Sequence, residues 1–318
     1  MSIYIFFPPL KTGSGGLRVL KDLVQILTKN GYEVKTSSDP NFFQTKLTSQ
    51  DVYLVPEGWF NALLPGLKAK AKIILYCQNW AYLFTGVPPD IDLVALPLTF
   101  WAVSYPVAWF MEQTLGVKAK ILRPSLDFKL FYPPEQKSLF PVKIAYMPRK
   151  NKGLTRQILQ TFLALTKPKK LADKIKFLPI ENLKPGQVGE VLRQAHIFLS
   201  TGFPEGLGLP PLEAMACNCL VVGFTGFGGW DYARPFNSHL VAPFDLPSLP
   251  WQKNGLFTSD GDVLNTALSL IEAVSWYLNQ DERFFKILEQ GQKTAQFYTA
   301  KNQKKTLLDL ISRVGIGN

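Results

Sequence analysis

Short runs of apolar residues recur along the chain and alternate with longer segments of helical periodicity. The runs occupy residues 3–7, 52–55, 73–77, 119–122, 143–146, 175–178, 197–199, 220–222 and 240–242. They are continuous rather than alternating, which is typical of strands buried on both faces of a sheet. Between the first two runs, leucines recur at helical spacing over residues 17–27, and Gly31 is placed to end that helix. This repeated succession of strand and helix predicts parallel sheets of the doubly wound α/β kind.

A proline-bearing polar stretch divides the chain into two parts. Residues 131–137 read Phe-Tyr-Pro-Pro-Glu-Gln-Lys and suit a linker, and a new strand follows at residues 143–146. We expect a short N-terminal domain over residues 1–135 and a C-terminal domain over residues 136–318. The pattern after Asp262 is helical to the end, and the last helix, with its apolar face, is a candidate to pack back on the first domain.

Composition narrows the class of protein. The 318 residues are enough for two α/β domains, and the 47% of hydrophobic residues and 19% of charged residues argue against disorder. The net charge of +11 favours an anionic ligand or an anionic membrane surface as a partner. No stripe of Lys and Arg interleaved with aromatic residues is present, so we do not expect binding of nucleic acid.

The three cysteines and two histidines indicate neither a disulfide framework nor a metal site. Cys217 and Cys219 lie in an apolar stretch and are expected to be buried thiols. The chain begins with a strand-like run and has no stretch of about 20 apolar residues. We therefore expect a cytoplasmic protein, with peripheral contact to a membrane left open.

The segment from residue 200 to residue 217 carries the strongest chemical signal. It reads as a strand end, a tight turn and a helix start, with Glu205 and Glu213 on either side of two glycines and two prolines. Backbone amides at a helix start favour an anion such as phosphate, and glycine lets a ligand approach the backbone closely. Carboxylates on both sides are strong acceptors for paired hydroxyls. A phosphate with hydroxyls on each side describes a nucleotide-sugar. The structural alternative is a glycine-rich turn in which Glu213 complements the helix dipole.

This segment resembles the E-x7-E motif of retaining glycosyltransferases with the GT-B fold, the family-four-like group known as glycosyl transferases group 1. The run EGLGLPPLEAMACNCLVV at residues 205–222 carries the resemblance most closely. Residues 237–245 and 280–299 resemble the strand and the terminal helices of that family, and residues 102–133 resemble its crossover between domains more loosely. The resemblance implies two Rossmann-like domains that face a cleft.

The resemblance also implies roles for individual residues. Glu213 would bind the ribose hydroxyls of the donor, and Glu205 would hold hydroxyls of the transferred sugar. The amides of Gly206, Leu207 and Gly208 would face the diphosphate or the sugar.

A cluster of cations follows the strand at residues 143–146. Arg149, Lys150 and Lys152 lie at the carboxyl end of that strand, where doubly wound sheets bind their ligands. The resemblance implies an Arg and a Lys that neutralise the leaving diphosphate. Arg149 fits the first position, and Lys152, beside Gly153, is preferred over Lys150 for the second. The alternative is a solvated basic loop.

Weaker candidates lie in three further segments. Gly15 and Gly16 end the glycine-rich stretch that begins at Lys11, and Arg18 stands where a dinucleotide-binding fingerprint needs glycine. Gln78 and Asn79 stand where many members of the family have a histidine. Gly226 lies in a glycine-rich loop whose Asp231 receives no role.

We therefore expect a retaining glycosyltransferase that moves a sugar from a nucleotide-diphosphate-sugar to a hydroxyl of a sugar or lipid-linked acceptor. The resemblance implies catalysis without a metal or a cofactor, because cations would stabilise the leaving group. The alternatives are a catalytically silent relative that binds glycan or nucleotide-sugar, a nucleotide-sugar epimerase, and a membrane-bound scaffold protein.

Overall fold

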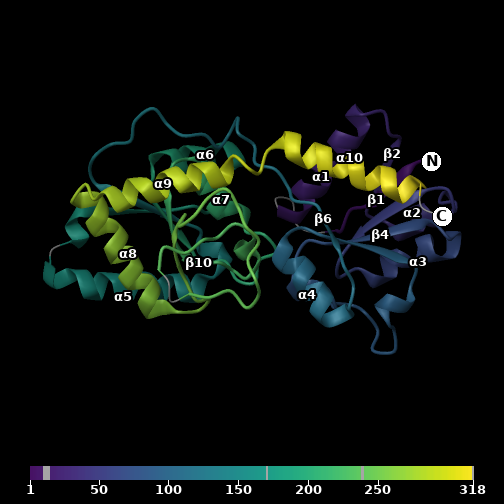
Figure 1. Ribbon diagram of the computed structural model, residues 1–318, viewed down its shortest axis with the longest axis horizontal. Coiled ribbons are helices and arrows are strands. Elements are labelled where there is room, and N and C mark those ends of the chain that lie inside the picture. Colours follow the sequence, from purple (N-terminus) through teal and green to yellow (C-terminus); the bar gives the residue numbers. More distant parts are fainter. Residues whose placement is uncertain (10–14, 170, 238–239, 317–318) are drawn as a thin grey trace. The chain divides into compact units, whose positions relative to one another are not determined.

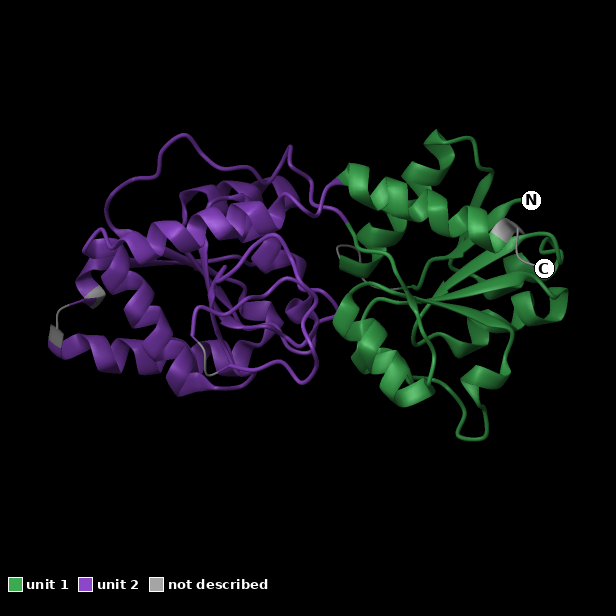
Figure 2. Ribbon diagram, viewed as in Figure 1, with its two compact units in different colours: residues 1–124, 300–318 green, residues 125–299 purple. Residues whose placement is uncertain are grey.

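A computed structural model describes residues 1–9, 15–169, 171–237 and 240–316. The chain divides into two compact units, of which unit 1 comprises residues 1–124 and 300–318 and unit 2 comprises residues 125–299 (Figure 2). The sequence placed the boundary after residue 135, whereas the linker after Pro124 groups with unit 2. The last helix groups with unit 1, where it lies against the first helix.

Unit 1 contains a parallel sheet with the strand order β2-β1-β3-β4-β5-β6 (Figure 1). Its strands are β1 (Ile3–Phe6), β2 (Val34–Ser37), β3 (Val52–Pro56), β4 (Lys72–Cys77), β5 (Leu98–Ala102) and β6 (Lys120–Ile121). Its helices are α1 (Gly15–Lys29), α2 (Pro40–Gln44), α3 (Phe60–Ala69), α4 (Tyr105–Leu115) and α10 (Ala300–Ile316). The residues of β1 and β3 are all buried, as their continuous apolar runs predict.

Unit 2 contains a second parallel sheet with the strand order β11-β10-β9-β7-β8. Its strands are β7 (Val142–Tyr146), β8 (Ile175–Pro179), β9 (Ile197–Ser200), β10 (Leu220–Phe224) and β11 (Leu256–Thr258). Its α-helices are α5 (Lys152–Thr166), α6 (Pro185–Gln194), α7 (Leu209–Ala216), α8 (Val263–Leu278) and α9 (Glu282–Ala295). Short 3-10 turns, η3 (Pro148–Lys150) and η6 (Gly228–Asp231), follow β7 and β10. The core of this unit joins apolar residues of β7, β9 and β10 to the inner faces of α5 and α8.

Three strands were not predicted, and one predicted strand is wrong. β2, β5 and β11 are short or mix polar residues with apolar ones, so they lack the continuous run that marks a buried strand. Residues 240–242 form no strand, and Val241 is 79% exposed, so this apolar run does not belong to the buried core. Among the described residues, no helix is long and apolar enough to cross a membrane.

Candidate functional site

The strand order of unit 2 creates a switch point between β7 and β9. The chain passes from β7 to β8 on one side of the sheet and then returns to place β9 on the other side. Ligands of doubly wound sheets bind outside the carboxyl ends of the strands at such a point, because the connections there diverge and leave a crevice. The segments that begin at Met147 and at Thr201 follow these two strands directly.

Two opposite charges from these segments meet at the switch point. The Nζ atom of Lys150 lies 2.6 Å from Oε1 of Glu205. The side chains are 26% and 17% exposed, so the ion pair is partly withdrawn from solvent. A charge-assisted hydrogen bond in such surroundings is stronger than one on an open surface. The pair presents both an ammonium and a carboxylate to a ligand at one place.

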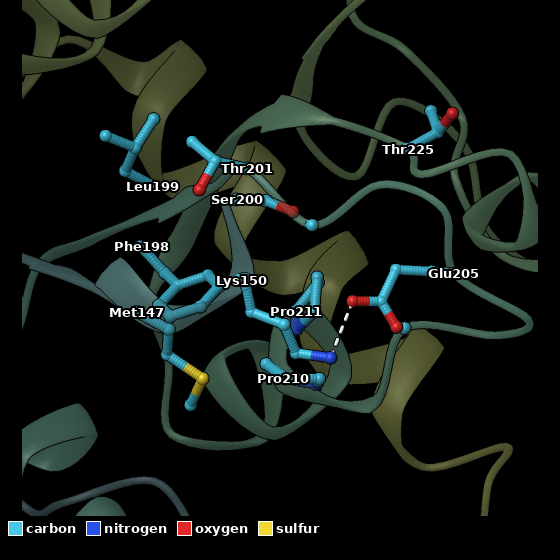
Figure 3. A pocket seen from close by; sticks show the side chains of 12 residues that line it. Met147, Lys150, Phe198, Leu199, Ser200, Thr201, Glu205, Pro210, Pro211 and Thr225 are labelled. Atoms are coloured by element: carbon cyan, nitrogen blue, oxygen red, sulfur yellow. Dashed lines mark hydrogen bonds and ion pairs between the residues drawn. The ribbon is translucent and has the colours of Figure 1, made fainter. Parts of the chain in front are cut away.

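A pocket of about 320 Å³, including space open to solvent, surrounds this pair (Figure 3). Its polar side chains other than the ion pair come from Ser200, Thr201 and Thr225. The remaining lining residues are Met147, Phe198, Leu199, Gly202, Gly208, Pro210 and Pro211. All of these belong to unit 2, so the pocket is formed at the carboxyl edge of one sheet.

The start of α7 forms part of the wall. Its N-cap, Gly208, has φ of 79°, which favours glycine, and its carbonyl accepts a hydrogen bond from the hydroxyl of Tyr232 at 3.0 Å. Pro210 and Pro211 suit the first turn because its amides have no partner within the helix. They also lack N–H groups, so the amides that this helix start can offer an anion are essentially those of Gly208 and Leu209.

The backbone beneath Glu205 is unusually close to its side chain. A Cβ atom on Gly202 would lie 2.5 Å from Oε1 of Glu205, and one on Gly226 would lie 2.9 Å from its Cγ. The N–H of Glu205 donates to the carbonyl of Gly226 at 2.9 Å, and its own carbonyl accepts from the N–H of Gly228 at 3.1 Å. These contacts hold the backbone of Glu205 and place two glycines against one side of its side chain.

Asp260 supports the loop that contains Gly226. Its carboxylate accepts the N–H groups of Gly226 at 2.8 Å and of Phe227 at 3.1 Å. Burial raises the pKa of Asp260 to about 6, although the hydrogen bonds from these amides act in the opposite direction. Asp260 was not predicted, and no local pattern marks it, since it acts on a loop that lies far away in the sequence.

The predicted site residues are only partly brought together. Lys150 is the cation that reaches Glu205 and lines the pocket, whereas Arg149 and Lys152 are exposed and are not among its lining residues. Gly208 lines the pocket, while Gly206 and Leu207 are buried beside it. Glu213 lies on α7 with only 6% of its surface exposed and does not line this pocket.

Unit 1 has its own switch point, between β1 and β3, and the weaker candidates Gly15, Gly16 and Gln78 belong to this unit, whereas Gly226 belongs to unit 2. A Cβ atom on Gly16 would lie 3.2 Å from Oε1 of Gln78. This Oε1 atom is buried and accepts no hydrogen bond within the described part of the chain. Gly15 begins α1 and has open space around it. Residues 11–14 of the predicted loop lie outside the described residues.

Glu57 lies at the carboxyl edge of the unit 1 sheet and was not predicted from the sequence. It directly follows β3, and its carboxylate accepts the consecutive N–H groups of Gln78 at 2.8 Å and Asn79 at 2.9 Å. Burial raises the pKa of Glu57 to about 7, against the effect of these two hydrogen bonds. An acidic residue at the end of an apolar strand, in Val-Tyr-Leu-Val-Pro-Glu, is the signal that could have identified it.

His196 has a structural role. Its Nδ1 accepts the N–H of Lys143 at 2.9 Å, and its Nε2 lies 2.8 Å from the carbonyl of Ser138, to which it donates. Burial lowers the pKa of His196 to about 4, so the ring is neutral near pH 7. His239 lies outside the described residues. Among those that are described, no group of three His, Cys, Asp or Glu residues could hold a metal ion.

Comparisons with known proteins find a recognisable segment that contains the lining residues from Phe198 to Thr225. Residues 159–245 match the family model of "Glycosyl transferases group 1". The chain is 28% identical over 190 residues to an alpha-1,6-glucosyltransferase of Actinobacillus pleuropneumoniae serotype 7 (strain AP76), an alignment that covers 58% of this chain and 56% of that protein. The chain thus spans little more than half the length of this curated relative.

Solved structures show the same architecture over the whole chain. The sucrose-phosphate synthase of Thermosynechococcus elongatus matches with a TM-score of 0.71 at 12% identity, and the match covers 100% of both chains. Anabaena HepE, solved in complex with UDP, matches with a TM-score of 0.64 at 12% identity and covers 98% of this chain and 100% of its own. The chain therefore has the GT-B fold of two Rossmann-like parallel-sheet units, and its second unit contains a segment similar to the glycosyl transferases of group 1.

Proposed function

We propose that this protein is a glycosyltransferase that uses a nucleotide-diphosphate-sugar as its donor. The observation that carries the proposal is the ion pair of Lys150 and Glu205 at the switch point of unit 2. An ammonium suits a diphosphate, and a carboxylate fixed beside it suits the hydroxyls of a sugar. The match to group 1 and the likeness to a UDP-bound protein of the same fold support this choice of donor.

In the proposed reaction, the bond between the anomeric carbon and the donor phosphate oxygen breaks, and its electron pair goes to that oxygen. The oxygen of an acceptor hydroxyl forms the new bond on the same face, and its proton passes to the departing phosphate. The configuration at the anomeric carbon is thus retained. The protein supplies electrostatic stabilisation for the charge that develops on the diphosphate.

Lys150 is the residue proposed for that electrostatic role, because its ammonium already lies in the pocket. Arg149 is adjacent in η3 and is placed to supply a second, more exposed cation. Glu205 would hold hydroxyls of the transferred sugar. Glu213, a buried residue of α7, would hold the ribose. The cations take the place of a metal ion in this scheme, and the acceptor is proposed to be a sugar or a lipid-linked sugar.

A panel of nucleotide-sugars tests the proposal. We expect one donor to raise the melting temperature of the chain and to be consumed when acceptors are added. Lys150→Met is expected to reduce kcat/KM by roughly 100-fold or more, since it removes a cation aimed at the leaving group. Lys176→Met removes an exposed lysine on β8 and is expected to leave kcat/KM unchanged. Lys152→Met decides which lysine acts, and we expect a much smaller effect than for Lys150→Met.

Three results would contradict this function. Absence of binding by every nucleotide and nucleotide-sugar in the panel would remove the donor site. A product in which the sugar is still attached to the nucleotide, with altered configuration, would indicate an epimerase instead. Binding without turnover across a broad set of acceptors would indicate a catalytically silent relative.

A further inference from the structure

The two partners of the pocket ion pair differ in how firmly they are held. Glu205 rests on the backbone of Gly202 and Gly226, at positions where a Cβ atom would collide with its side chain. Its N–H and carbonyl both bond to the loop at residues 226–228. The backbone of Glu205 is thereby tied to this loop, and the two glycines close off one side of its side chain.

Lys150 has the opposite character. Its flexible four-carbon side chain extends from the short turn η3, and its ammonium is a compact charge that can rotate between acceptors. The side chain is 26% exposed, so it has solvent-accessible space into which to move. When a diphosphate enters the pocket, Lys150 is therefore the partner that can reorient.

A diphosphate and the carboxylate of Glu205 are both anions, and in the proposed complex both would compete for the ammonium of Lys150. The oxygen of Glu205 lies 2.6 Å from Nζ of Lys150, within a pocket whose other described polar side chains are hydroxyls. An anion that takes Lys150 leaves a carboxylate without its counter-charge and next to further negative charge. This unfavourable contact is relieved most fully when hydroxyl groups arrive with the anion and donate to the carboxylate.

We propose that Glu205 and the donor diphosphate exchange Lys150, and that this exchange makes Glu205 the residue that discriminates the intact nucleotide-sugar from the spent nucleotide. In the free protein Lys150 bonds to Glu205. In the donor complex Lys150 bonds to the diphosphate, and the sugar hydroxyls replace it at Glu205. In the complex with nucleoside diphosphate alone, nothing replaces it, so the spent nucleotide binds less tightly and leaves. This inference rests on the proposed function and adds a means of product release to it.

The experiment measures the dissociation constants of a nucleoside diphosphate and of the matching nucleotide-glucose by calorimetry, with UDP, ADP and GDP each tried. Glu205→Gln keeps the size of the side chain and removes its charge. We expect this variant to bind the nucleoside diphosphate roughly three- to tenfold more tightly. We expect it to bind the nucleotide-sugar no more tightly than the unmodified chain does, so that the ratio of the two constants falls.

Two further variants make the result specific. Glu181→Gln makes the same change in net charge, since it removes an exposed carboxylate that lies near Tyr146 at the end of β7. We expect the ratio of the two constants to stay unchanged in this variant. A fall in the ratio here would show that net charge alone is responsible. In a chain that already carries Lys150→Met, the addition of Glu205→Gln should no longer tighten nucleoside diphosphate binding. This double-mutant cycle isolates the exchange of Lys150 from a general loss of negative charge.

The outcomes separate the two proposals. If Glu205→Gln leaves the affinity for nucleoside diphosphate unchanged or weakens it, Lys150 holds both anions at once and the exchange is wrong, while the donor site stands. If neither ligand binds the unmodified chain, the proposed function fails and the exchange fails with it. Circular dichroism spectra of the variants that match the unmodified chain show that they are folded.

Discussion

The carboxylate of Asp260 accepts the backbone N–H of Gly226 at 2.8 Å, and it thereby fixes the loop on which Glu205 rests. Its second oxygen accepts the N–H of Phe227 at 3.1 Å. Phe227 has φ of 65°, which a residue with a side chain rarely adopts, so this loop depends on outside support. Asp260 follows β11 and links the far edge of the sheet to the pocket.

Asp260→Asn should therefore disturb the pocket from a distance. The asparagine can accept only one of the two N–H groups, and its amide would turn a donor toward the other. We expect the free energy of unfolding to fall by about 1–3 kcal/mol and the affinity for the nucleotide-sugar to fall with it. Urea denaturation and calorimetry measure the two effects.

Asp262→Asn is the matched control for this substitution. Asp262 is the N-cap of α8 and accepts the N–H of Asn265 at 3.0 Å, a role that asparagine fills equally well. We expect little change in stability or affinity. Equal effects of the two substitutions would show that loss of a negative charge, rather than loss of the loop contact, is responsible.

The fold could be predicted from the sequence because its strands are buried on both faces. Runs such as residues 52–55 and 220–222 are continuous and apolar, and the strands β3 and β10 are buried throughout. The edge strand β2 contains Lys35 and two hydroxyl residues, which leaves no such signal. A prediction of the doubly wound class needs only the regular succession of buried strands, so the missing edge strands did not change it.

The pocket could be predicted less completely, since it depends on the direction of side chains. The spacing from Glu205 to Glu213 identified the turn and the helix start correctly as segments. It could not show which of three cations within residues 149–152 reaches Glu205, because η3 and the start of α5 set their directions. The supporting contacts of Asp260 and Glu57 join residues far apart in the sequence, and no spacing rule includes such pairs.

Glu57 should make the stability of unit 1 depend on pH. Its pKa is about 7 in the folded chain, above the value of 4.5 that is usual for a glutamate, because the carboxylate is buried. Between these two values the folded chain keeps a proton that the unfolded chain releases. The free energy of unfolding therefore falls as the pH rises from 4.5 to 7, and this contribution is constant above and below that window.

Comparison of the unmodified chain with Glu57→Gln isolates this effect. Glutamine does not titrate, so the difference in unfolding free energy between the two proteins should decline by roughly 1–3 kcal/mol between pH 4.5 and pH 7. Urea denaturation at a series of pH values measures it. Glu112→Gln, an exposed position on α4, should give a difference that does not vary with pH in this way. A flat difference for Glu57→Gln as well would show that the carboxylate is not buried in solution.

The linker is attached to unit 2 at two points, which agrees with a boundary at residue 124 rather than at residue 135, and the later of these points is Lys137. Its ammonium donates to the carbonyl of Asn218 at 2.6 Å and to the carbonyl of Ala195, which lie just after α7 and at the end of α6. A cation is favoured at two helix C-termini, even though burial lowers its pKa. Arg193 adds a second attachment, since it donates to the carbonyl of Leu130 at 2.6 Å. The linker is thereby bound to unit 2 along its length.

Lys137→Met should destabilise unit 2 because the methionine fills the same space and leaves both carbonyls without this donor. We expect the free energy of unfolding to fall by about 2–4 kcal/mol, as measured by urea denaturation. Lys129→Met, at an exposed position in the same linker, should change it by less than about 0.5 kcal/mol. The acceptors of Lys137 directly precede β9 and β10, whereas Glu205 follows the carboxyl end of β9. The affinity for nucleotide-sugar at a temperature where the variant is folded should therefore stay unchanged. A loss of affinity without a loss of stability would mean that the linker positions the pocket rather than holding the unit together.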